Sequence, residues 1–305
     1  AVAAGLCFAA IGTDTAGSIR LPSAYCGITG LKPTYGLVSA SGVIPLCWSY
    51  DHVGPMTRTA LDAAIVLDAI AGYDPEDPNS VLISYEPVAP KIRSLPKGLR
   101  VAITGGVFLT DLDPEIEQGF KSAMQLLFRV FETTPFTIEV PLETDKTVRL
   151  AEPFAYHTPI MRNSSHLYQP ATLTRIKTGE GISAADYLHS REELRAFRKQ
   201  SLTLWDKIDL LVSPCVPSLA SKIDDLVNDV AGLRTRELRM LRNTRPFNAL
   251  GTPAISVPCG VTPNGMPLAL QLAAAPRNDC LLLQAANALE QVTHWKERLP
   301  RDPKW

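Results

Sequence analysis

The chain has 305 residues, of which 46% are apolar, and its 30 basic and 31 acidic side chains leave a formal net charge of -1. This balance argues against binding to nucleic acid or anionic membranes by bulk electrostatics, because that mode needs a basic excess. No apolar run approaches the roughly 20 residues of a membrane-spanning helix, so the composition predicts a soluble globular protein with a substantial core.

The first ten residues, AVAAGLCFAA, are small and apolar. Because neither an initiator methionine nor a basic segment precedes them, they resemble neither a natural start nor a signal peptide. The pattern predicts that Ala1–Ala10 is the middle of a buried helix and that the chain is incomplete at its N-terminus. Within this stretch, Phe8–Ile11 also has the character of a short apolar strand that leads into a turn.

Periodicity and turn residues predict the next elements. Thr59 and Asp62 resemble a capping box, so we expect a helix to begin there. A strand over 99–103, a helix that begins at Pro114 and a strand over 136–140 form a strand–helix–strand unit, which is typical of an α/β sheet. The apolar stripe of its helix comprises Ile116, Phe120, Ala123, Met124, Leu127 and Phe131.

The second half of the chain is predicted to return to the sheet after a helical excursion. In order, we expect a charged and mainly helical segment over 150–208, a buried strand over 209–212, two strands over 254–258 and 268–272 with a turn at Asn264-Gly265, and a last helix over 281–291. No repeat, low-complexity tract or linker divides these elements. The sequence therefore predicts one α/β domain over residues 1–305, with a mainly helical insert over 150–245.

Five arginines lie close together within this insert, at positions 234, 236, 239, 242 and 245. Such a cluster is typical either of a nucleic-acid patch or of a solvated helix face. The neutral charge balance of the chain favours the solvated face, so no nucleic acid is expected as a partner.

The six cysteines are widely scattered, at positions 7, 26, 47, 215, 259 and 280. They form no Cys-x-x-Cys pair and have no histidine at metal spacing, so no metal site is expected. Most lie in apolar neighbourhoods, where a free cysteine behaves as a small buried hydrophobe, and this usage is typical of a reducing cytoplasm. No Walker loop or Gly-x-Gly-x-x-Gly motif is present, so no nucleotide cofactor is expected.

The segment GTDTAGSIRLPSAYCG over residues 12–27 carries the most chemical information. An apolar strand runs into a turn of small residues, and Ser18 stands where a helix can begin. The backbone N–H groups that can point into one concavity there belong to Thr15, Ala16, Gly17 and Ser18. Such donors stabilise an oxyanion that forms beside a serine oxygen, whereas a serine in this position often serves only as an N-cap. Both roles stay open at this stage.

Four segments together resemble the amidase signature family: residues 12–27, GLKPTYG over 30–36, WSYDHVGPM over 48–56 and NALGTPAISVPCG over 248–260. Members of that family are amide hydrolases with a mixed central β-sheet flanked by helices, and a Ser-cisSer-Lys triad cleaves the carboxamide through an acyl-enzyme. The resemblance implies that Ser18 is the nucleophile and that residues 15–18 form the oxyanion hole. It also implies that Asp14 helps to hold the hole in shape, that Arg20 is structural, and that the helical insert lies on the substrate side.

Two departures from the family pattern bear on activity. Ala16 replaces the more usual glycine, and its methyl group restricts φ and can crowd the oxyanion hole. The family's catalytic lysine and bridging cis-serine belong to a region upstream of the matched segments, and this chain lacks both positions. Ser18 alone is therefore expected to keep the geometry of the hole with very little turnover.

Two groups within the chain are candidates for a substitute base, Lys32 and the Asp51–His52 pair, and His157 is a further residue of interest. Lys32 is interpreted as a structural or surface lysine. Asp51 and His52 suggest a Ser-His-Asp arrangement, but adjacent residues seldom face each other and no Gly-x-Ser-x-Gly elbow is present, so Asp51 is interpreted as a structural hydrogen-bonding residue. His157 is expected on a partly exposed helix face rather than in the wall of a substrate pocket.

The sequence thus predicts an amidase-type hydrolase that acts on a small-molecule carboxamide in the cytoplasm, without cofactor or metal. Two alternatives stay open: the A subunit of a tRNA-dependent glutamyl or aspartyl amidotransferase, which passes ammonia to a partner acting on misacylated tRNA, and a catalytically inactive fragment or pseudoenzyme. Residues 156–209, which include ISAADYL over 182–188, resemble stand-alone amidases and favour the hydrolase. A homo-oligomer is compatible with the sequence, and no membrane span is expected.

Overall fold

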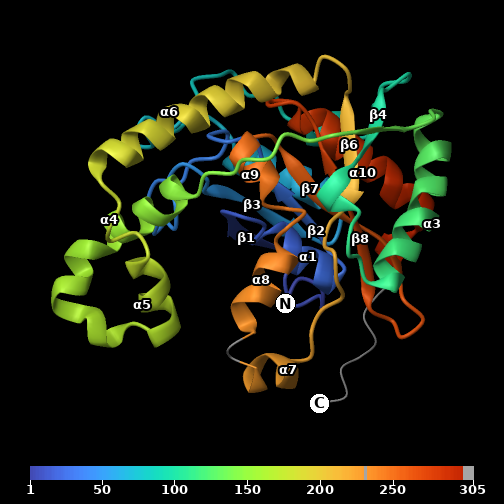
Figure 1. Cartoon of the computed structure of the whole chain (residues 1–305). Coiled ribbons are helices and arrows are strands. Elements are labelled where there is room, and N and C mark those ends of the chain that lie inside the picture. The colour runs from blue at the N-terminus through green and yellow to red at the C-terminus, as the bar shows by residue number, and fades with distance from the viewer. Residues whose placement is uncertain (230–231, 298–305) are drawn as a thin grey trace.

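The computed structural model describes residues 1–229 and 232–297, and within them eight strands form one sheet in the order β1-β3-β2-β7-β8-β6-β4-β5 (Figure 1). The strands are β1 (Ala9–Asp14), β2 (Thr29–Lys32), β3 (His52–Thr57), β4 (Val101–Thr104), β5 (Phe136–Ile138), β6 (Leu210–Pro214), β7 (Ala254–Val261) and β8 (Pro267–Ala273). The helices are α1 (Arg20–Cys26), α2 (Ala60–Ile70), α3 (Pro114–Phe131), α4 (Thr147–Ser164), α5 (Pro170–Lys177), α6 (Ala184–Ser201), α7 (Ile223–Asn228), α8 (Leu233–Met240), α9 (Pro246–Leu250) and α10 (Asp279–Thr293).

The sheet is mixed, as the resemblance to the amidase signature family implies. Strand β4 pairs in parallel with β5 and β6, whereas the other neighbouring pairs are antiparallel. The expected strand–helix–strand unit is confirmed as β4–α3–β5. The expected hairpin is confirmed as β7 and β8, whose turn contains Gly265 at φ 83°, in the left-handed region that favours glycine.

Local signals place the helices well. The Thr59 hydroxyl accepts a hydrogen bond from the Asp62 N–H, which confirms the capping box at the start of α2. Helix α3 begins at Pro114, where the missing N–H removes one donor that would have no partner in the helix. The residues of α3 that are buried are the predicted apolar stripe: Ile116, Phe120, Ala123, Met124, Leu127 and Phe131.

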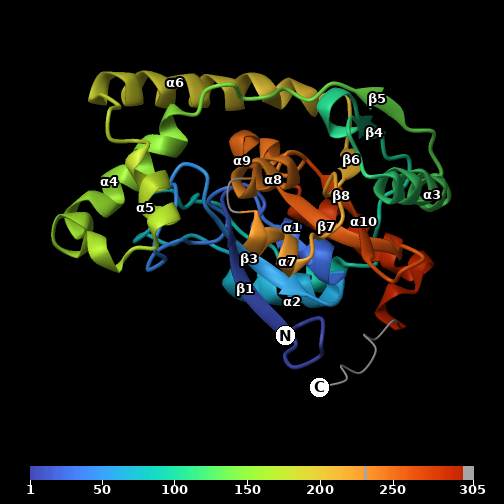
Figure 2. The ribbon, with the colours of Figure 1, turned by 60° about the horizontal axis from the view of Figure 1, so that its bottom comes forward.

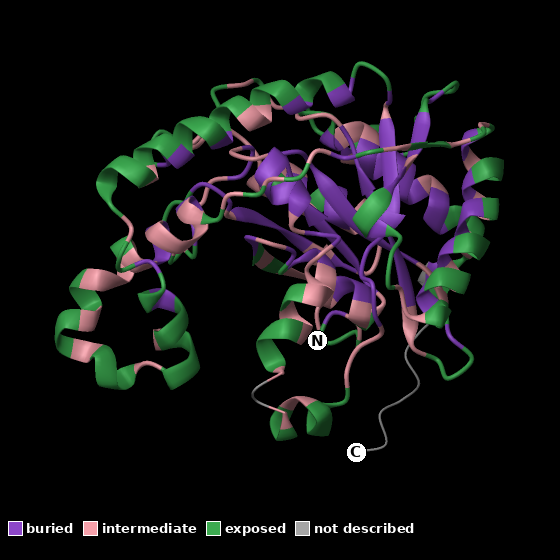
Figure 3. Ribbon diagram, viewed as in Figure 1, coloured by how far each residue is buried: buried purple, intermediate pink, exposed green. Residues whose placement is uncertain are grey.

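Alternation along the strands divides the core into two layers. On β8, Leu270 and Leu272 belong to the apolar cluster that includes α2, α3 and α10. Ala269 and Ala273 face the other way, because successive side chains of a strand point to opposite faces, and they pack in clusters with residues of α1 and α9. Figure 3 shows central strands such as β3, β6 and β8 as mostly buried, whereas the edge strand β5 is mostly exposed.

The helices that follow β5 lie outside the sheet, along one side of the molecule. Helix α6 runs along the top in two views, and α4 and α5 stand to one side of the sheet (Figures 1 and 2). This confirms the helical prediction for residues 150–208. The wider range 150–245 also contains β6, which is fully part of the central sheet.

The predicted helix over Ala1–Ala10 is wrong. Residues 2–5 form turns, and the chain enters β1 at Ala9, in agreement with the strand character of Phe8–Ile11. Strand β1 is an edge strand that pairs only with β3 in the described structure, and 88% of the Phe8 surface is exposed. Short-range apolar character does not distinguish helix from strand, and the pairing with β3 decides for the strand.

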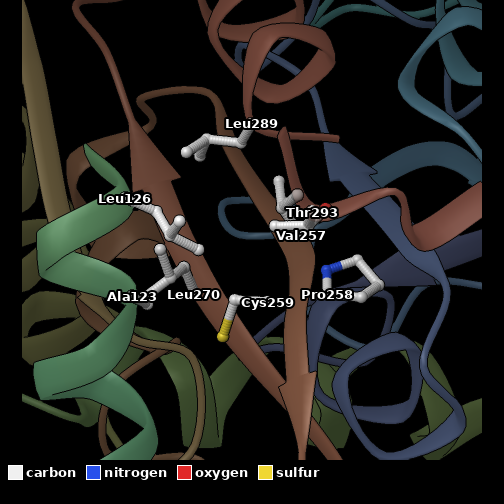
Figure 4. A pocket seen from close by; sticks show the side chains of 8 residues that line it. All are labelled: Ala123, Leu126, Val257, Pro258, Cys259, Leu270, Leu289 and Thr293. Carbon is white, nitrogen blue, oxygen red and sulfur yellow. The ribbon is translucent and has the colours of Figure 1, made fainter. Parts of the chain in front are cut away.

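Two further findings concern cavities and membranes. An apolar cavity lies between α3, α10 and the β7–β8 pair, next to Ala123, Val257 and Leu289 (Figure 4). Its volume of about 10 Å³ is far below the roughly 300 Å³ of a small-molecule site, so it is a packing defect. Among the described residues, no helix has the length and apolar character that crossing a membrane requires.

The packing of α3 can be tested at Leu127, which is fully buried. The substitution Leu127→Ala is expected to lower the free energy of unfolding by about 2–5 kcal/mol, because it removes buried apolar atoms and leaves a cavity. Gln125→Ala, on the exposed face of the same helix, is the matched control and is expected to change it by less than about 0.5 kcal/mol. Urea unfolding of both variants measures the difference, and equal midpoints would contradict this packing.

Candidate active site

Ser18 lies in the loop that joins β1 to α1 and is exposed. Its expected alternative role as an N-cap is wrong, because α1 begins at Arg20 and its N-cap residue is Ile19. The N–H groups of Ile19 and Arg20 instead approach Asp14 Oδ2, at 3.2 and 3.4 Å. A carboxylate from the preceding strand thus takes the donors at the start of the helix, and the Ser18 hydroxyl is left exposed.

The central interaction beneath this loop is the ion pair of Asp14 and Arg20, both fully buried. Arg20 Nε donates to Asp14 Oδ2 at 3.0 Å and Arg20 Nη2 donates to Oδ1 at 2.9 Å, which is a two-point contact. Burial alone would raise the pKa of Asp14, but the charge and hydrogen bonds of Arg20 lower it well below its usual value. Asp14 is therefore ionised at any physiological pH.

The remaining donors of Arg20 are also satisfied. Nη1 donates to the Thr244 carbonyl at 2.8 Å and to Gln271 Oε1 at 2.7 Å, and Nη2 donates to Asn248 Oδ1 at 2.7 Å. A guanidinium has five N–H groups, and all five have an acceptor here. The Ser18 loop is thereby tied to the turn before α9, to α9 itself and to β8.

Two more contacts fix the loop from opposite sides. The Thr15 hydroxyl donates a short hydrogen bond to Asp51, and the Thr244 hydroxyl donates to the Ala16 carbonyl at 2.6 Å. Gly17 has φ 139°, and a Cβ there would lie 2.1 Å from Thr244 Oγ1, so the backbone needs glycine at this position.

Ala16 fits the loop without backbone strain. Among the described residues, the non-glycine residues with positive φ are Asp111, Glu132, Arg277 and His294. Ala16 is not one of them, so the restriction of φ expected from its methyl group does not strain the loop.

The loop also presents unused backbone donors. In the part of the chain that the structure describes, no acceptor takes the N–H of Ala16, Gly17 or Ser18. Their neighbours at 19 and 20 donate to Asp14, as described above. Three free N–H groups beside an exposed hydroxyl are able to stabilise negative charge that develops on a bound carbonyl oxygen.

The two basic side chains considered as a substitute base are both committed to the protein interior. Lys32 is fully buried, which confirms a structural role and excludes a surface one; its Nζ donates to the carbonyls of Thr252 at 2.5 Å and Pro33 at 3.3 Å. His52 is also buried, and its Nδ1 lies 2.6 Å from the Tyr50 carbonyl. Burial lowers the pKa of both groups.

Asp51 does not face its neighbour His52. Its carboxylate accepts the Thr15 hydroxyl and the N–H groups of Leu46 and Cys47, at 2.8 and 2.9 Å, so the structural hydrogen-bonding role is confirmed. His157 lies on α4, is half-buried and has its Nδ1 2.8 Å from the Tyr168 hydroxyl, as expected of a partly exposed helix residue.

Three residues that hold the loop escaped the sequence prediction. Thr244, Asn248 and Gln271 are more than 220 positions from the loop in sequence. Asn248 belongs to a motif that the sequence singled out, but its contact to Asp14 depends on the position of α9. No local pattern signals such contacts.

All six cysteines are free thiols. Cys47 and Cys215 are buried as expected, whereas Cys26 is exposed, because it ends α1 on the solvent side. Among the described residues, no group of three or more His, Cys, Asp or Glu side chains has the arrangement of a metal site.

A sequence model of the Amidase family matches residues 1–283. The chain belongs to the amidase signature family. It is 33% identical to an amidase of Pseudomonas putida, over 98% of this chain and 66% of that protein. It is also 33% identical to the A subunit of the glutamyl-tRNA(Gln) amidotransferase of Moorella thermoacetica, over 98% of this chain and 66% of that protein. The chain thus spans about two thirds of the length of these relatives.

Two solved structures of other proteins have the same fold as this chain. A 6-aminohexanoate cyclic dimer hydrolase superposes with a TM-score of 0.83 at 27% identity, over 98% of this chain and 67% of the other. The A subunit of the glutamyl-tRNA(Gln) amidotransferase of Thermotoga maritima superposes with a TM-score of 0.76 at 29% identity, over 95% and 63% of the two chains. The predicted family and fold are therefore confirmed.

The Asp14–Arg20 pair predicts a pH dependence of stability. Asp14→Asn is expected to lower the free energy of unfolding at pH 7 by about 3–5 kcal/mol, because it leaves a buried guanidinium without its counter-charge. The pKa of Asp14 is lowered in the folded state, so its contribution is complete above the unfolded value near 4. The difference from the unsubstituted protein should shrink by about 1.4 kcal/mol per pH unit below that value.

Urea unfolding at a series of pH values measures this difference. The control is Asp111→Asn, which removes a carboxylate that pairs with Arg239 at the surface and is 71% exposed. That change is expected to cost less than about 1 kcal/mol at every pH. A similar small cost for Asp14→Asn would contradict the role given to the buried pair.

The close approach at Gly17 gives a second prediction for the loop. Gly17→Ala is expected to lower the free energy of unfolding by about 1–3 kcal/mol, since the new methyl group meets Thr244 in a backbone conformation unfavourable for alanine. Gly181→Ala is the matched control, because nothing lies within 4 Å of its added Cβ and its φ is not in the left-handed region. Equal thermal midpoints for the two variants would refute the tight packing at Gly17.

Proposed function

We propose that this chain is an amidase-type hydrolase that cleaves a carboxamide C–N bond through an acyl-enzyme on Ser18. The observation that supports this most is the exposed residue Ser18, at the position of the family nucleophile, in a loop with three N–H donors that no described residue uses. Asp14 and Arg20 lie beneath the loop and hold it in one conformation, which also supports the proposal. The small-molecule amide itself is identified only by its reacting group.

In the proposed reaction, Ser18 Oγ attacks the carbonyl carbon of the amide. The carbonyl oxygen becomes an oxyanion and accepts hydrogen bonds from the N–H groups of residues 16–18. Contacts of Thr15 with Asp51 and of Ala16 with Thr244 hold this part of the loop in place. The C–N bond then breaks, and ammonia or an amine leaves with the proton that the Ser18 hydroxyl gave up. Water then hydrolyses the serine ester to the carboxylic acid and returns a proton to Ser18 Oγ. Lys32 and His52 are not proposed as the base, because each is buried against backbone carbonyls.

A second candidate is the A subunit of a tRNA-dependent amidotransferase. It is favoured by the comparisons, in which several relatives at 30–33% identity are named as A subunits of glutamyl-tRNA(Gln) amidotransferases. In that case the ammonia released at Ser18 would pass to a partner that acts on misacylated tRNA. Co-purification of the chain with a tRNA-binding partner, and ammonia transfer to charged tRNA, would establish this candidate over the stand-alone hydrolase.

A serine-directed probe tests the proposed nucleophile. A fluorophosphonate or sulfonyl fluoride should label Ser18, and Ser18→Ala should abolish the labelling. On the chain lengthened upstream along its reading frame, Ser18→Ala should also lower amide turnover by at least about 1,000-fold. Ser49→Ala is the matched control, because Ser49 is buried and its hydroxyl donates to Glu152 at 2.5 Å.

The same probe separates the proposal from an inactive fragment or pseudoenzyme. Labelling is measured on the 305-residue chain and on the chain lengthened upstream along its reading frame. Absence of labelling and turnover in both would support the inactive alternative. Labelling confined to a site other than Ser18 would refute the proposed nucleophile.

A further inference from the structure

Arg198, near the end of α6, connects the helical insert to two backbone segments that lie outside it. Its Nε donates to the Ala249 carbonyl at 2.8 Å, and its Nη2 donates to the carbonyls of Ser49 at 2.6 Å and Asn248 at 3.3 Å. The side chain is half-buried, and its guanidinium carbon lies 4.8 Å from the centre of the Tyr35 ring. One guanidinium thus holds α6, α9 and the segment before β3 together.

Arg198 donates its hydrogen bonds to backbone carbonyls rather than to a carboxylate. Among the described residues, no Asp or Glu forms an ion pair with it, whereas Arg195 on the same helix pairs with Glu192 at 3.0 Å. The N–H groups of a guanidinium are fixed in a planar fork, so they hold two acceptors at a set separation. Arg198 is therefore placed to fix the distance between the two backbone segments.

The first of these segments holds the β1–α1 loop through Asp51, which accepts the Thr15 hydroxyl. Two residues earlier, the insert binds both backbone groups of Ser49. Its N–H donates to Glu152 on α4 at 2.9 Å, and its carbonyl accepts from Arg198 on α6. Both are main-chain groups, so the control substitution Ser49→Ala leaves them in place. The insert thereby sets the position of the segment that carries Asp51.

The second segment, α9, holds the same loop through Asn248. The side chain of Asn248 donates to Asp14 Oδ1 at 2.9 Å and accepts from Arg20 Nη2 at 2.7 Å. Arg198 binds the carbonyls of Asn248 and Ala249 at the C-terminal end of α9, where carbonyls have no partner within the helix and a cation is favourable. Both supports of the loop are therefore held by one side chain of the insert.

We propose that Arg198 is a positioning residue for the reaction at Ser18. It couples the helical insert to the β1–α1 loop, because it fixes the separation of the two segments whose Asp51 and Asn248 side chains hold that loop. It acts through these two residues and not by contact with the substrate. This inference rests on the proposed hydrolase function and gives the insert control over the geometry of the N–H donors at residues 16–18.

The test begins with Arg198→Met, which removes the hydrogen bonds and keeps an apolar side chain beside Tyr35. Turnover is measured on the chain lengthened upstream along its reading frame, with acetamide, hexanamide and benzamide as probes. The kcat per folded molecule should fall by about 10–100-fold, because small displacements of catalytic groups have effects of this size. KM should change by less than about threefold, since the residue does not bind the substrate. A loss confined to KM, or no loss, overturns the proposal.

Arg198→Lys separates the fork from the charge, and it replaces the methionine variant if that variant does not fold. Lysine keeps the positive charge but has one nitrogen in place of the planar fork, so it does not hold both segments at the same separation. Its kcat should stay at least about fivefold below that of the unsubstituted protein. Full activity of this variant would assign the effect to charge alone and overturn the proposal.

Arg195→Met is the matched control, because Arg195 lies on the same helix, has a side chain that is 73% exposed and pairs with Glu192 at the surface. It should keep kcat within about twofold, since such pairs contribute little to the fold. Thermal unfolding gives the folded fraction of each variant at the assay temperature, to which kcat is normalised. A loss of kcat as large as that in Arg198→Met would overturn the specific role of Arg198.

Hydrogen exchange separates this inference from the proposed function. The N–H groups of the loop that donate to Asp14 exchange only when it opens, so the peptide over residues 12–21 reports its opening. In Arg198→Met this peptide should exchange at least about tenfold faster, while the peptide over 114–131 keeps its rate.

The outcomes divide between the two proposals. If no amide is turned over and Ser18 is not labelled, but the loop exchanges faster in Arg198→Met, the hydrolase proposal fails and the coupling by Arg198 stands. If amides are hydrolysed, the positioning role requires both the loss of kcat and the faster exchange of the loop. Either effect without the other overturns the positioning role and leaves the hydrolase proposal standing.

Discussion

The ion pair of Asp14 and Arg20 is the interaction on which the candidate site depends. A fully buried carboxylate and guanidinium are costly to remove from water, and the cost is offset only when every donor has an acceptor. Here Asp14, Thr244, Asn248 and Gln271 together take all five N–H groups of Arg20. Because these residues come from β1, the turn before α9, α9 and β8, the pair connects the reacting loop to the centre of the fold.

The sheet explains why the acceptors meet at this point. Residues of β8 alternate between its two faces, so Leu270 and Leu272 enter the apolar layer beneath α2, α3 and α10. Gln271 then points to the opposite layer, where it reaches Arg20 and also donates to Ser213 on β6 at 3.0 Å. One face of the sheet thus packs against the most extensive of the apolar clusters. The other face carries the polar network that positions Ser18.

The polar network separates the groups around the serine into those that are hydrogen-bonded to the protein and those that are not. Lys32, His52 and Asp51 all carry titratable side chains near the loop, yet their hydrogen bonds go to the protein and hold it together. Ser18 is exposed, and the N–H groups of residues 16–18 have no acceptor in the described structure. Groups left unsatisfied in a well-paired environment are the ones best suited to meet a substrate.

The sequence by itself determined the elements with strong local signals and the family. The Thr59 cap, the stripe of α3 and the Asn264-Gly265 hairpin each depend on neighbours within a few residues, so short-range physics suffices. The motif around Ser18 identified the candidate nucleophile only through its resemblance to the family, because its local pattern also fitted an N-cap. Only the tertiary structure decided that residues 9–14 are a strand, that Lys32 is buried, and that Thr244, Asn248 and Gln271 hold the loop. Those outcomes depend on pairing and burial between segments more than 200 positions apart, or on a partner strand, which no local pattern encodes.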